Sequence, residues 1–429
     1  MEWILLACLA ALMVLGVPIG YGIILACIIY LALVDLSPMV VVPQQITLGL
    51  DSFPLLAVPL FILMGFILER ARLTNYLVDW LNVIIGRLPG GMGAVAIVGC
   101  AMLAALTGSG PATVVAIGLI MIPALVDRAG YDKQTAAGLV AVAGALGPIL
   151  PPSIIMILYG ATIGVSITDI FIGGIIPGLM LFSALLLWNL WKSRSFTAPD
   201  VQQVARNETG DSLGKMTLRV IPIGLIPVTV VGGIYGGYVT PTEAAAVGVV
   251  ASLVLALSYR RLTLALFRET IFSTVRTSAL VCTLLAAAGI LSWVLAKTKL
   301  PTRVAEVLAP ALGNEYVYLI ALLGILFVVG TVMESAASVV ILAPILAPIG
   351  MELGVDPVHL AVVFCMALVV GYVTPPFGIN LFTAVSVGKI PYGQVVKGSL
   401  QPLIVMVIVC ILVALIPQTA TFLPSLLNG

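Results

Sequence analysis

The sequence predicts an all-α polytopic membrane protein made of two related halves, and three observations support this fold class. Hydrophobic residues make up 61% of the 429-residue chain and charged residues only 9%, whereas a soluble domain carries roughly 25% charged residues. Apolar stretches close to the ~20 residues that cross a bilayer recur along the whole length. A polar turn followed by a Pro-Pro pair occurs twice, 224 residues apart.

The remaining composition excludes several other classes of protein. The net charge of +1 gives no reason to expect a nucleic-acid partner. The six cysteines stand alone within apolar runs, a pattern typical of buried small side chains and not of disulfides or metal sites. Residues 1–15 lack a basic start and continue into further apolar sequence, so they predict a first membrane segment and not a cleaved signal.

The two halves keep one register over a long stretch of sequence. The landmarks that share the spacing of 224 residues are Thr107 and Thr331, Asp132 and Asp356, Pro151 and Pro375, and Gly174 and Gly398. We therefore predict a first half at residues 1–192, a linker at 193–218 and a second half at 219–429. Interrupted segments at matching positions of two halves are typical of the binding site of a transporter.

The first half begins with an apolar stretch that Gly16 and Pro18 interrupt, which predicts one kinked helix or two short ones. An amphipathic segment between two apolar ones suits the membrane interface. A hairpin that enters and leaves on one side, a helix broken at Pro151-Pro152 and an uninterrupted span then follow. The expected elements are, in order, residues 3–34, 53–69, 76–88, 91–106, a hairpin at about 107–128, a broken helix at about 134–167, and 170–192.

The linker is the one long polar stretch, and its Lys and Arg residues predict a cytoplasmic position. In the second half, Thr240 and Glu243 fit a capping box with Pro241 at the first helical position. The expected elements are spans at 219–235 and 242–258, an amphipathic segment at 262–274, an apolar segment at 275–296, a span at 316–331, a hairpin at about 331–350, a broken helix at about 359–388 and a last span at 400–417.

The basic residues also predict how the halves are oriented. If residues 275–296 cross the membrane, Lys297 and Lys299 lie outside, against the positive-inside tendency. If this segment bends back, five crossings separate the two Pro-Pro breaks, and the halves are inverted repeats. We prefer the second arrangement, in which Arg70, Arg72 and Arg87 lie outside. The first hairpin then enters from the cytoplasm and the second from the opposite side.

The repeated interruptions predict Na⁺ sites. Non-helical backbone survives at membrane depth only where protein or a water-filled cavity covers it. Each proline lacks an N–H and frees a carbonyl one turn earlier, and unwound carbonyls with nearby hydroxyls suit Na⁺. The predicted Na⁺ ligands are Thr107, Ser109, Gly147, Pro148, Leu150, Thr331, Glu334, Ser335, Gly371 and Thr374.

The same stretches predict a site for an anionic substrate. The helix starts after each break, at Ser153 and Phe377, carry partial positive charge, and Asn380 is the most polar side chain beyond the second break. The predicted substrate-binding residues are Ser109, Pro151, Pro152, Ser153, Ser335, Pro375, Pro376, Gly378 and Asn380. Simpler alternatives stay open: a tight turn, a plain proline kink, Glu334 at a wet hairpin mouth, and His359 as a helix flank at the interface.

Six stretches together resemble one known family over nearly the full chain, the large membrane (M, DctM-like) subunit of tripartite ATP-independent periplasmic (TRAP) transporters. They are Gly86-Arg-Leu-Pro-Gly-Gly91, Gly130-Tyr-Asp132, Gly147-Pro-Ile-Leu-Pro-Pro-Ser153, Gly233-Ile-Tyr-Gly-Gly237, Thr240-Pro-Thr-Glu-Ala-Ala-Ala246 and Val373-Thr-Pro-Pro-Phe-Gly-Ile-Asn380.

The resemblance implies an elevator-type, Na⁺-coupled importer of organic acids in a bacterial inner membrane, with a scaffold and a mobile transport domain. C4-dicarboxylates, sialic acid and other carboxylates are substrates of the family. The resemblance also implies two partner chains, a small membrane subunit (Q type) and a periplasmic substrate-binding protein (P type). It assigns Na⁺ and substrate binding to Ser109, residues 147–153, Glu334-Ser335 and residues 374–380. Glu334 differs from the aspartate or asparagine associated with that position.

Three other functions fit parts of the sequence. A self-sufficient Na⁺/dicarboxylate carrier of similar repeat architecture would need no binding protein. An intramembrane serine hydrolase would use Ser109, but this chemistry needs a base within hydrogen-bond reach, and the only histidine is His359. A passive channel would show flux without any ion gradient. We expect a transporter and not an enzyme.

Overall fold

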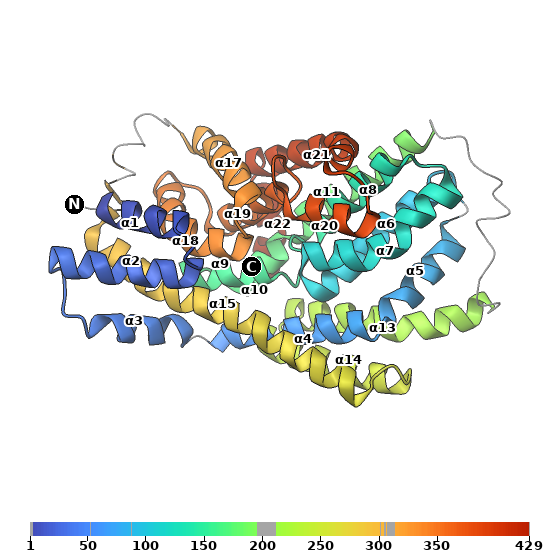
Figure 1. Cartoon of the computed structure of the whole chain (residues 1–429), viewed down its shortest axis with the longest axis horizontal. Helices are drawn as coiled ribbons and strands as arrows, with labels where there is room; N and C mark the ends of the chain where they lie inside the picture. Colours follow the sequence, from blue (N-terminus) through green and yellow to red (C-terminus); the bar gives the residue numbers. More distant parts are fainter. Residues whose placement is uncertain are drawn as a thin grey trace.

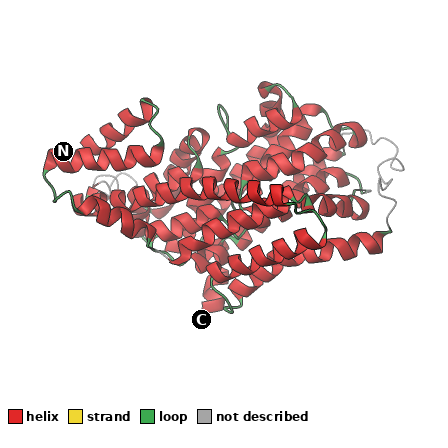
Figure 2. Ribbon diagram, turned by 60° about the horizontal axis from the view of Figure 1, so that its bottom comes forward, coloured by secondary structure: helices red, strands yellow, loops and turns green. Residues whose placement is uncertain are grey.

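The computed structural model of the protein describes residues 3–51, 53–86, 88–194, 212–300, 302–303, 306 and 314–428. These residues form helices joined by short loops, and no strand occurs among them (Figure 2). Eight of the described helices are long and apolar enough to cross a membrane, or up to nine if one bent pair is a single span. The predicted all-α membrane architecture is confirmed.

The N-terminal part contains two short helices where the sequence allowed either one kinked helix or two. Gly16 adopts a φ of 79° between them, and Pro18 directly precedes the second. Helices α1, α2 and α3 lie together at one end of the molecule (blue in Figure 1). The bounds are α1 Trp3–Val14, α2 Ile19–Val34, α3 Val41–Leu50, η1 Phe53–Leu56, α4 Ala57–Arg70 and α5 Leu73–Ile84.

Two interruptions separate the helices of the next segment, one after Thr107 and one across Pro151-Pro152. The bounds are α6 Gly91–Thr107, α7 Gly110–Ala129, α8 Lys133–Ala143, η2 Gly144–Leu146, α9 Ile154–Ile163, α10 Ile167–Gly173 and α11 Ile175–Ser193. Most of the predicted linker, residues 195–211, lies outside the described residues.

The C-terminal part contains the predicted capping box at the start of α14, where Thr240 N donates to Glu243 Oε2 (2.8 Å) and Glu243 N donates to Thr240 Oγ1 (3.3 Å). The bounds are α13 Leu213–Tyr235, α14 Pro241–Ser258, α15 Leu264–Thr298, α17 Glu315–Val332, α18 Ser335–Glu352, α19 Pro357–Gly371, α20 Ile379–Gly388, α21 Tyr392–Leu415 and α22 Gln418–Asn428.

Helix α15 differs from the prediction that its apolar part bends back. It is a single helix of 35 residues, with no Gly or Pro between Leu264 and Ala288 to interrupt it. It packs against α2, α3 and α4 along one side and against α9 and α18 along another. The change from amphipathic to apolar sequence therefore marks a change of surroundings along one helix and not a break.

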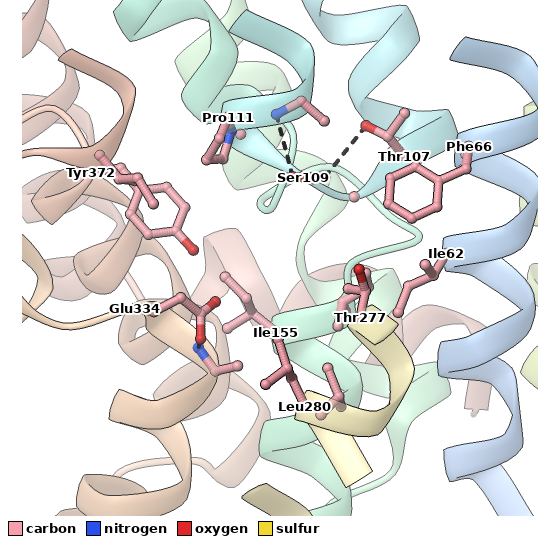
Figure 3. Close-up of a pocket in the computed structure, with 18 of the residues that line it drawn as sticks. Ile62, Phe66, Thr107, Ser109, Pro111, Ile155, Thr277, Leu280, Glu334 and Tyr372 are labelled. Carbon is pink, nitrogen blue, oxygen red and sulfur yellow. Dashed lines mark hydrogen bonds between the residues drawn. The ribbon is translucent and has the colours of Figure 1, made fainter. Parts of the chain in front are cut away.

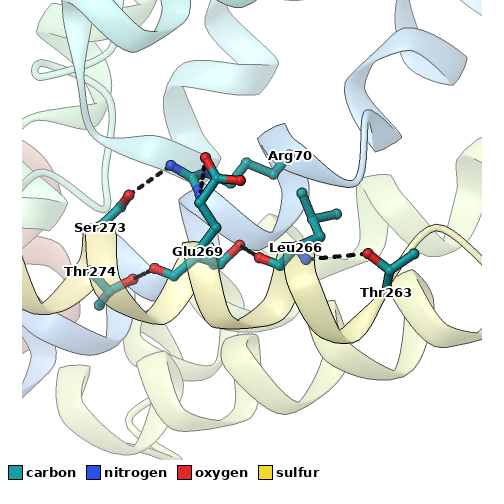
Figure 4. Close-up of polar contacts among 7 residues, drawn as sticks. Arg70, Thr263, Leu266, Glu269, Ser273 and Thr274 are labelled. Carbon is teal, nitrogen blue, oxygen red and sulfur yellow. Dashed lines mark hydrogen bonds and ion pairs between the residues drawn. The ribbon is translucent and has the colours of Figure 1, made fainter.

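The end of α4 also lies on a different side from the prediction. Arg70 Nη1 is 3.2 Å from Glu269 Oε1, and Arg70 Nη2 donates to Ser273 Oγ (2.7 Å) on the first turns of α15 (Figure 4). Arg261 Nη2 donates to the Tyr76 hydroxyl (3.1 Å) at the same end.

These contacts place Arg70 and its neighbour Arg72 beside the basic end of α14 and α15. Their predicted location outside, across the membrane from the basic linker, was wrong, because Glu269 draws the arginine to the linker side. Arg87 lies outside the described residues.

Glycine pairs set the closest contacts between helices. A Cβ at Gly398 of α21 would overlap the backbone of Gln134 where α8 and α21 meet, and a Cβ at Gly371 of α19 would overlap the backbone of Gly330 on α17. Small residues let helix backbones approach closely in membranes, where apolar association alone provides little driving force. These contacts hold α8 and α19, the helices that precede the two breaks, at fixed positions.

Candidate functional site

The first polar turn connects α6 to α7 through residues chosen for local backbone geometry. Gly108 adopts a φ of 61°, and Ser109 is the N-cap of α7, accepting a hydrogen bond from Ala112 N (3.4 Å). Ser109 N in turn donates to Thr107 Oγ1 (3.4 Å). Both hydroxyl oxygens thus lie at the start of α7, and a neutral side chain caps its positive end.

The first Pro-Pro break follows α8 and is closed from within. Pro151 and Pro152 are joined by a cis peptide bond, and Ser153 caps α9 while its hydroxyl donates to Pro148 O. Among the described residues, the carbonyl oxygens of Gly147 and Leu150 accept no hydrogen bond. Pro151 lacks the N–H that would reach Gly147 O in a continuous helix, so this predicted ligand is available to an ion.

The second polar turn connects α17 to α18 with a carboxylate in place of a hydroxyl. Glu334 is the N-cap of α18, and its Oε2 accepts from Ala336 N (3.1 Å) and Ala337 N (3.3 Å). Thr331 Oγ1 donates to Val328 O (2.8 Å). A charged side chain therefore already occupies the positive end of α18.

The second break is tied to its surroundings instead of to itself. Pro375 and Pro376 are also joined in cis. Gly371 O accepts from Thr374 N (3.1 Å) and Tyr372 O accepts from Asn380 N (3.0 Å), so both carbonyls that lost a helical donor have another. Because each carbonyl has two lone pairs, Gly371 O keeps one for a ligand.

The helix that follows each break packs against the opposite half. Helix α9 contacts α18 and α19, and α20 contacts α7 and α8. Asn380 on α20 donates through Nδ2 to Ala141 O of α8 (3.1 Å). Its Oδ1 and Ser335 Oγ are buried and have no hydrogen-bond partner among the described residues. Buried polar atoms of this kind are normally satisfied, so these two oxygens mark positions suited to a ligand.

Both turns meet at one cavity of about 330 Å³ (Figure 3). Ser109 and Pro111 come from one side, Glu334 and Tyr372 from another, and the Tyr372 hydroxyl points toward the Glu334 carboxylate. Side chains of α4 and α15 form the facing wall, and Ile155 of α9 also lines the cavity. A volume of this size suits a small molecule.

Three of the predicted site residues line this cavity: Thr107, Ser109 and Glu334. The remaining ones lie behind it, and among these Ser153, Ser335 and Asn380 are fully buried. At the second break, Pro376 is exposed and does not line the cavity. The arrangement brings the two turns together and places the breaks as their support.

The sequence missed the wall formed by α4 and α15. Its cavity-lining residues include Ile62, Phe66 and Glu69 of α4 and Thr277 and Leu280 of α15. Glu69, an acidic residue at the end of an apolar run, was the one available signal, because ionisable residues near membrane depth indicate function.

His359 lies away from this cavity. It is 1% exposed, and its Nε2 is 2.8 Å from Val413 O of α21. The predicted position at the membrane interface was wrong, because the ring satisfies a buried carbonyl between two helices.

The comparisons with known proteins agree on one family. The model of the DctM component of the tripartite ATP-independent periplasmic transporter matches residues 6–419. The isethionate TRAP transporter permease protein DctMQ of Oleidesulfovibrio alaskensis is 36% identical over 96% of this chain, and the chain spans 65% of that protein. The sialic acid TRAP transporter large permease protein SiaM of Vibrio cholerae is 33% identical, with 96% of each chain covered.

A solved structure shows the same fold without close sequence similarity. The chain resembles the YdaH transporter of Alcanivorax borkumensis with a TM-score of 0.62 at 14% identity, covering 86% of this chain and 87% of that one. At this identity the likeness supports the arrangement of helices alone.

Proposed function

Because the chain belongs to the DctM family of large membrane components of TRAP transporters, we propose that it imports an organic acid in symport with Na⁺. It is a multi-pass inner-membrane transport protein and not an enzyme, as its relatives are permeases. The observation that carries the proposal is the cavity at which the two polar turns meet. Free carbonyls and buried unpaired oxygens next to it suit Na⁺ binding.

The proposed movement is elevator-type. The two turns, the two broken helices and the cavity side that they form move as one body, and the wall of α4 and α15 stays with the scaffold. Two features support this division: the cavity lies at the boundary between the two groups, and Asn380 joins α20 to α8 within the moving group. The spacing of 224 residues and the approach of the turns from two sides of the cavity support inverted halves.

The proposed system contains two further chains, a small membrane subunit and a periplasmic substrate-binding protein. The relatives are TRAP permeases, which does not favour a self-sufficient Na⁺/dicarboxylate carrier. Uptake by the chain alone, without either partner, would instead support that carrier.

The test is uptake into proteoliposomes that contain this chain and its small membrane subunit, with the binding protein outside. An inward Na⁺ gradient should drive uptake of an organic acid, and replacing Na⁺ with choline should abolish it. Thr107→Val removes one cavity hydroxyl and should reduce Na⁺-dependent uptake about tenfold, the equivalent of one ligand worth about 1.4 kcal/mol. Thr47→Val, on the exposed face of α3, is the matched control. Uptake that ignores the Na⁺ gradient would refute the coupling.

The movement has its own test. Cysteines at Leu280 of α15 and Pro111 of α7 face the cavity from its two sides (Figure 3). A bifunctional thiol reagent should join them and stop uptake, and cleavage of the reagent should restore it. Each single-cysteine variant is the control. Full uptake with the two sides joined would rule out a sliding movement.

A further inference from the structure

The charged groups at the cavity differ from those expected for a site that binds a dianion. The side chains that line it include two carboxylates, Glu69 and Glu334, and among the described lining residues none is Lys or Arg. The other polar groups are hydroxyls of Thr107, Ser109, Thr277 and Tyr372. A dicarboxylate in this cavity would meet two like charges without a basic side chain to balance them.

The nearest arginine is directed elsewhere. Arg70 follows Glu69 in the sequence, but its guanidinium lies 3.2 Å from Glu269 and donates to Ser273 (Figure 4). Glu269 offsets its charge, so the group of Glu69, Arg70 and Glu269 remains negative overall. The α4 side of the cavity therefore repels anions.

The helix ends at the cavity divide it into two regions of opposite character. The starts of α7 and α9 have neutral caps, Ser109 and Ser153, and residues of both starts line the cavity. Their partial positive charges are available to a carboxylate. The start of α18 is capped by Glu334, whose carboxylate takes up its N–H groups and adds a full negative charge.

We infer that the substrate carries one carboxylate, bound at the starts of α7 and α9, and a neutral or cationic group toward Glu69 and Glu334. The apolar side chains between these ends, such as Ile155 and Leu280, suit a carbon skeleton. The substrate class is thus a monoanionic or zwitterionic organic acid in preference to a dicarboxylate. This inference rests on the proposed function and specifies its substrate.

Three four-carbon probes test this inference, because they differ only at one end: butyrate, succinate and 4-aminobutyrate. The affinity of each is measured from the shift in unfolding temperature of the purified chain with its small membrane subunit, so that the binding protein does not select among them. We expect succinate to bind at least about tenfold more weakly than 4-aminobutyrate, a difference of about 1.4 kcal/mol.

Variants identify the responsible charges. Glu69→Gln with Glu334→Gln should bring the three affinities to within about threefold of one another. Glutamine at position 334 can still accept the hydrogen bonds that cap α18, so the helix is retained. Glu352→Gln removes the same charge from the exposed far end of α18 and should leave the order of affinities unchanged.

Three results would overturn the inference. They are equal or tighter binding of succinate, an unchanged order of affinities in the double variant, and binding of none of the three probes. Na⁺-driven uptake of any organic acid by the complete system is measured separately. If that uptake persists while the charge preference is absent, the substrate class is wrong and the proposed function stands. If uptake is absent while the preference persists, the proposed function is wrong.

Discussion

The two Pro-Pro breaks match in sequence position but differ in how the rest of the protein covers them. In the first, Pro151, Pro152 and Ser153 are all buried, and Ser153 caps the next helix. In the second, Pro376 and Phe377 are exposed, and Gly378 provides no side-chain cap for α20.

The second break is held by neighbours instead. Gly378 N donates to Thr331 O (3.3 Å) of the second turn, and the Tyr392 hydroxyl donates to Pro376 O (2.7 Å) and Phe377 O (3.1 Å). The same diproline pattern is thus stabilised locally in one half and by tertiary contacts in the other. The second break depends on the position of α21, whereas the first does not.

The largest expected difference between the breaks concerns the matched glycines that precede them. A Cβ at Gly371 would overlap the backbone of Gly330, whereas a Cβ at Gly147 would lie 3.2 Å from Ser109 C and O. Gly371→Ala should therefore destabilise the protein by about 2–3 kcal/mol and Gly147→Ala by less than about 1 kcal/mol. Unfolding temperatures of the purified variants measure both. A larger loss for Gly147→Ala would reverse the comparison.

The next difference concerns Asn380, which only the second break carries. Its Nδ2 donates to Ala141 O, but its buried Oδ1 has no partner among the described residues. Asn380→Leu removes one hydrogen bond and one unsatisfied oxygen together, so stability should change by less than about 1 kcal/mol.

If Oδ1 serves a ligand, the same variant should lower Na⁺-dependent uptake at least about tenfold. Thr383→Val, exposed on the same helix, is the control for both measurements. A variant with normal uptake would show that Asn380 only joins α20 to α8.

A smaller effect is expected at the cap of the first break. Ser153→Ala removes the acceptor for Met156 N and the donor to Pro148 O, and loss of such a cap costs about 1 kcal/mol. The matched position in the second half is Phe377, half exposed and without a capping role. Phe377→Ala should change the unfolding temperature less than Ser153→Ala does, and the opposite order would mean that the first break is not held by its own cap.

The sequence was sufficient for features that arise from local chemistry. Proline lacks an N–H, so the breaks at Pro151 and Pro375 followed from the residues alone. The capping box of Thr240 and Glu243 and the N-caps of α7 and α9 likewise depend on side chains within three residues of the helix start.

Features that depend on tertiary position were not predictable in this way. Glu69 and Thr277 are far apart in the sequence, and only the packing of α4 against α15 brings both to the cavity. Arg70 was placed on the wrong side because counting charges along the chain ignores its pairing with Glu269. The continuity of α15 was missed because a change of polarity was interpreted as a change of element.

The smallest expected effect tests whether α21 holds the second break. Tyr392→Phe removes the hydroxyl that reaches Pro376 O and Phe377 O but keeps the ring stacked on Phe382, 4.8 Å away between centroids. Because these bonds are exposed, the loss of stability should be only about 0.5–1 kcal/mol. Local opening is the more sensitive measure, since hydrogen exchange follows the free energy of each region separately. The amides of residues 377–380 should exchange faster in the variant while those of 153–157 stay unchanged. Tyr238→Phe, at a side chain that is 86% exposed, is the matched control. If both regions exchanged at unchanged rates, the second break would be as self-supporting as the first, and the contrast between them would be one of exposure alone.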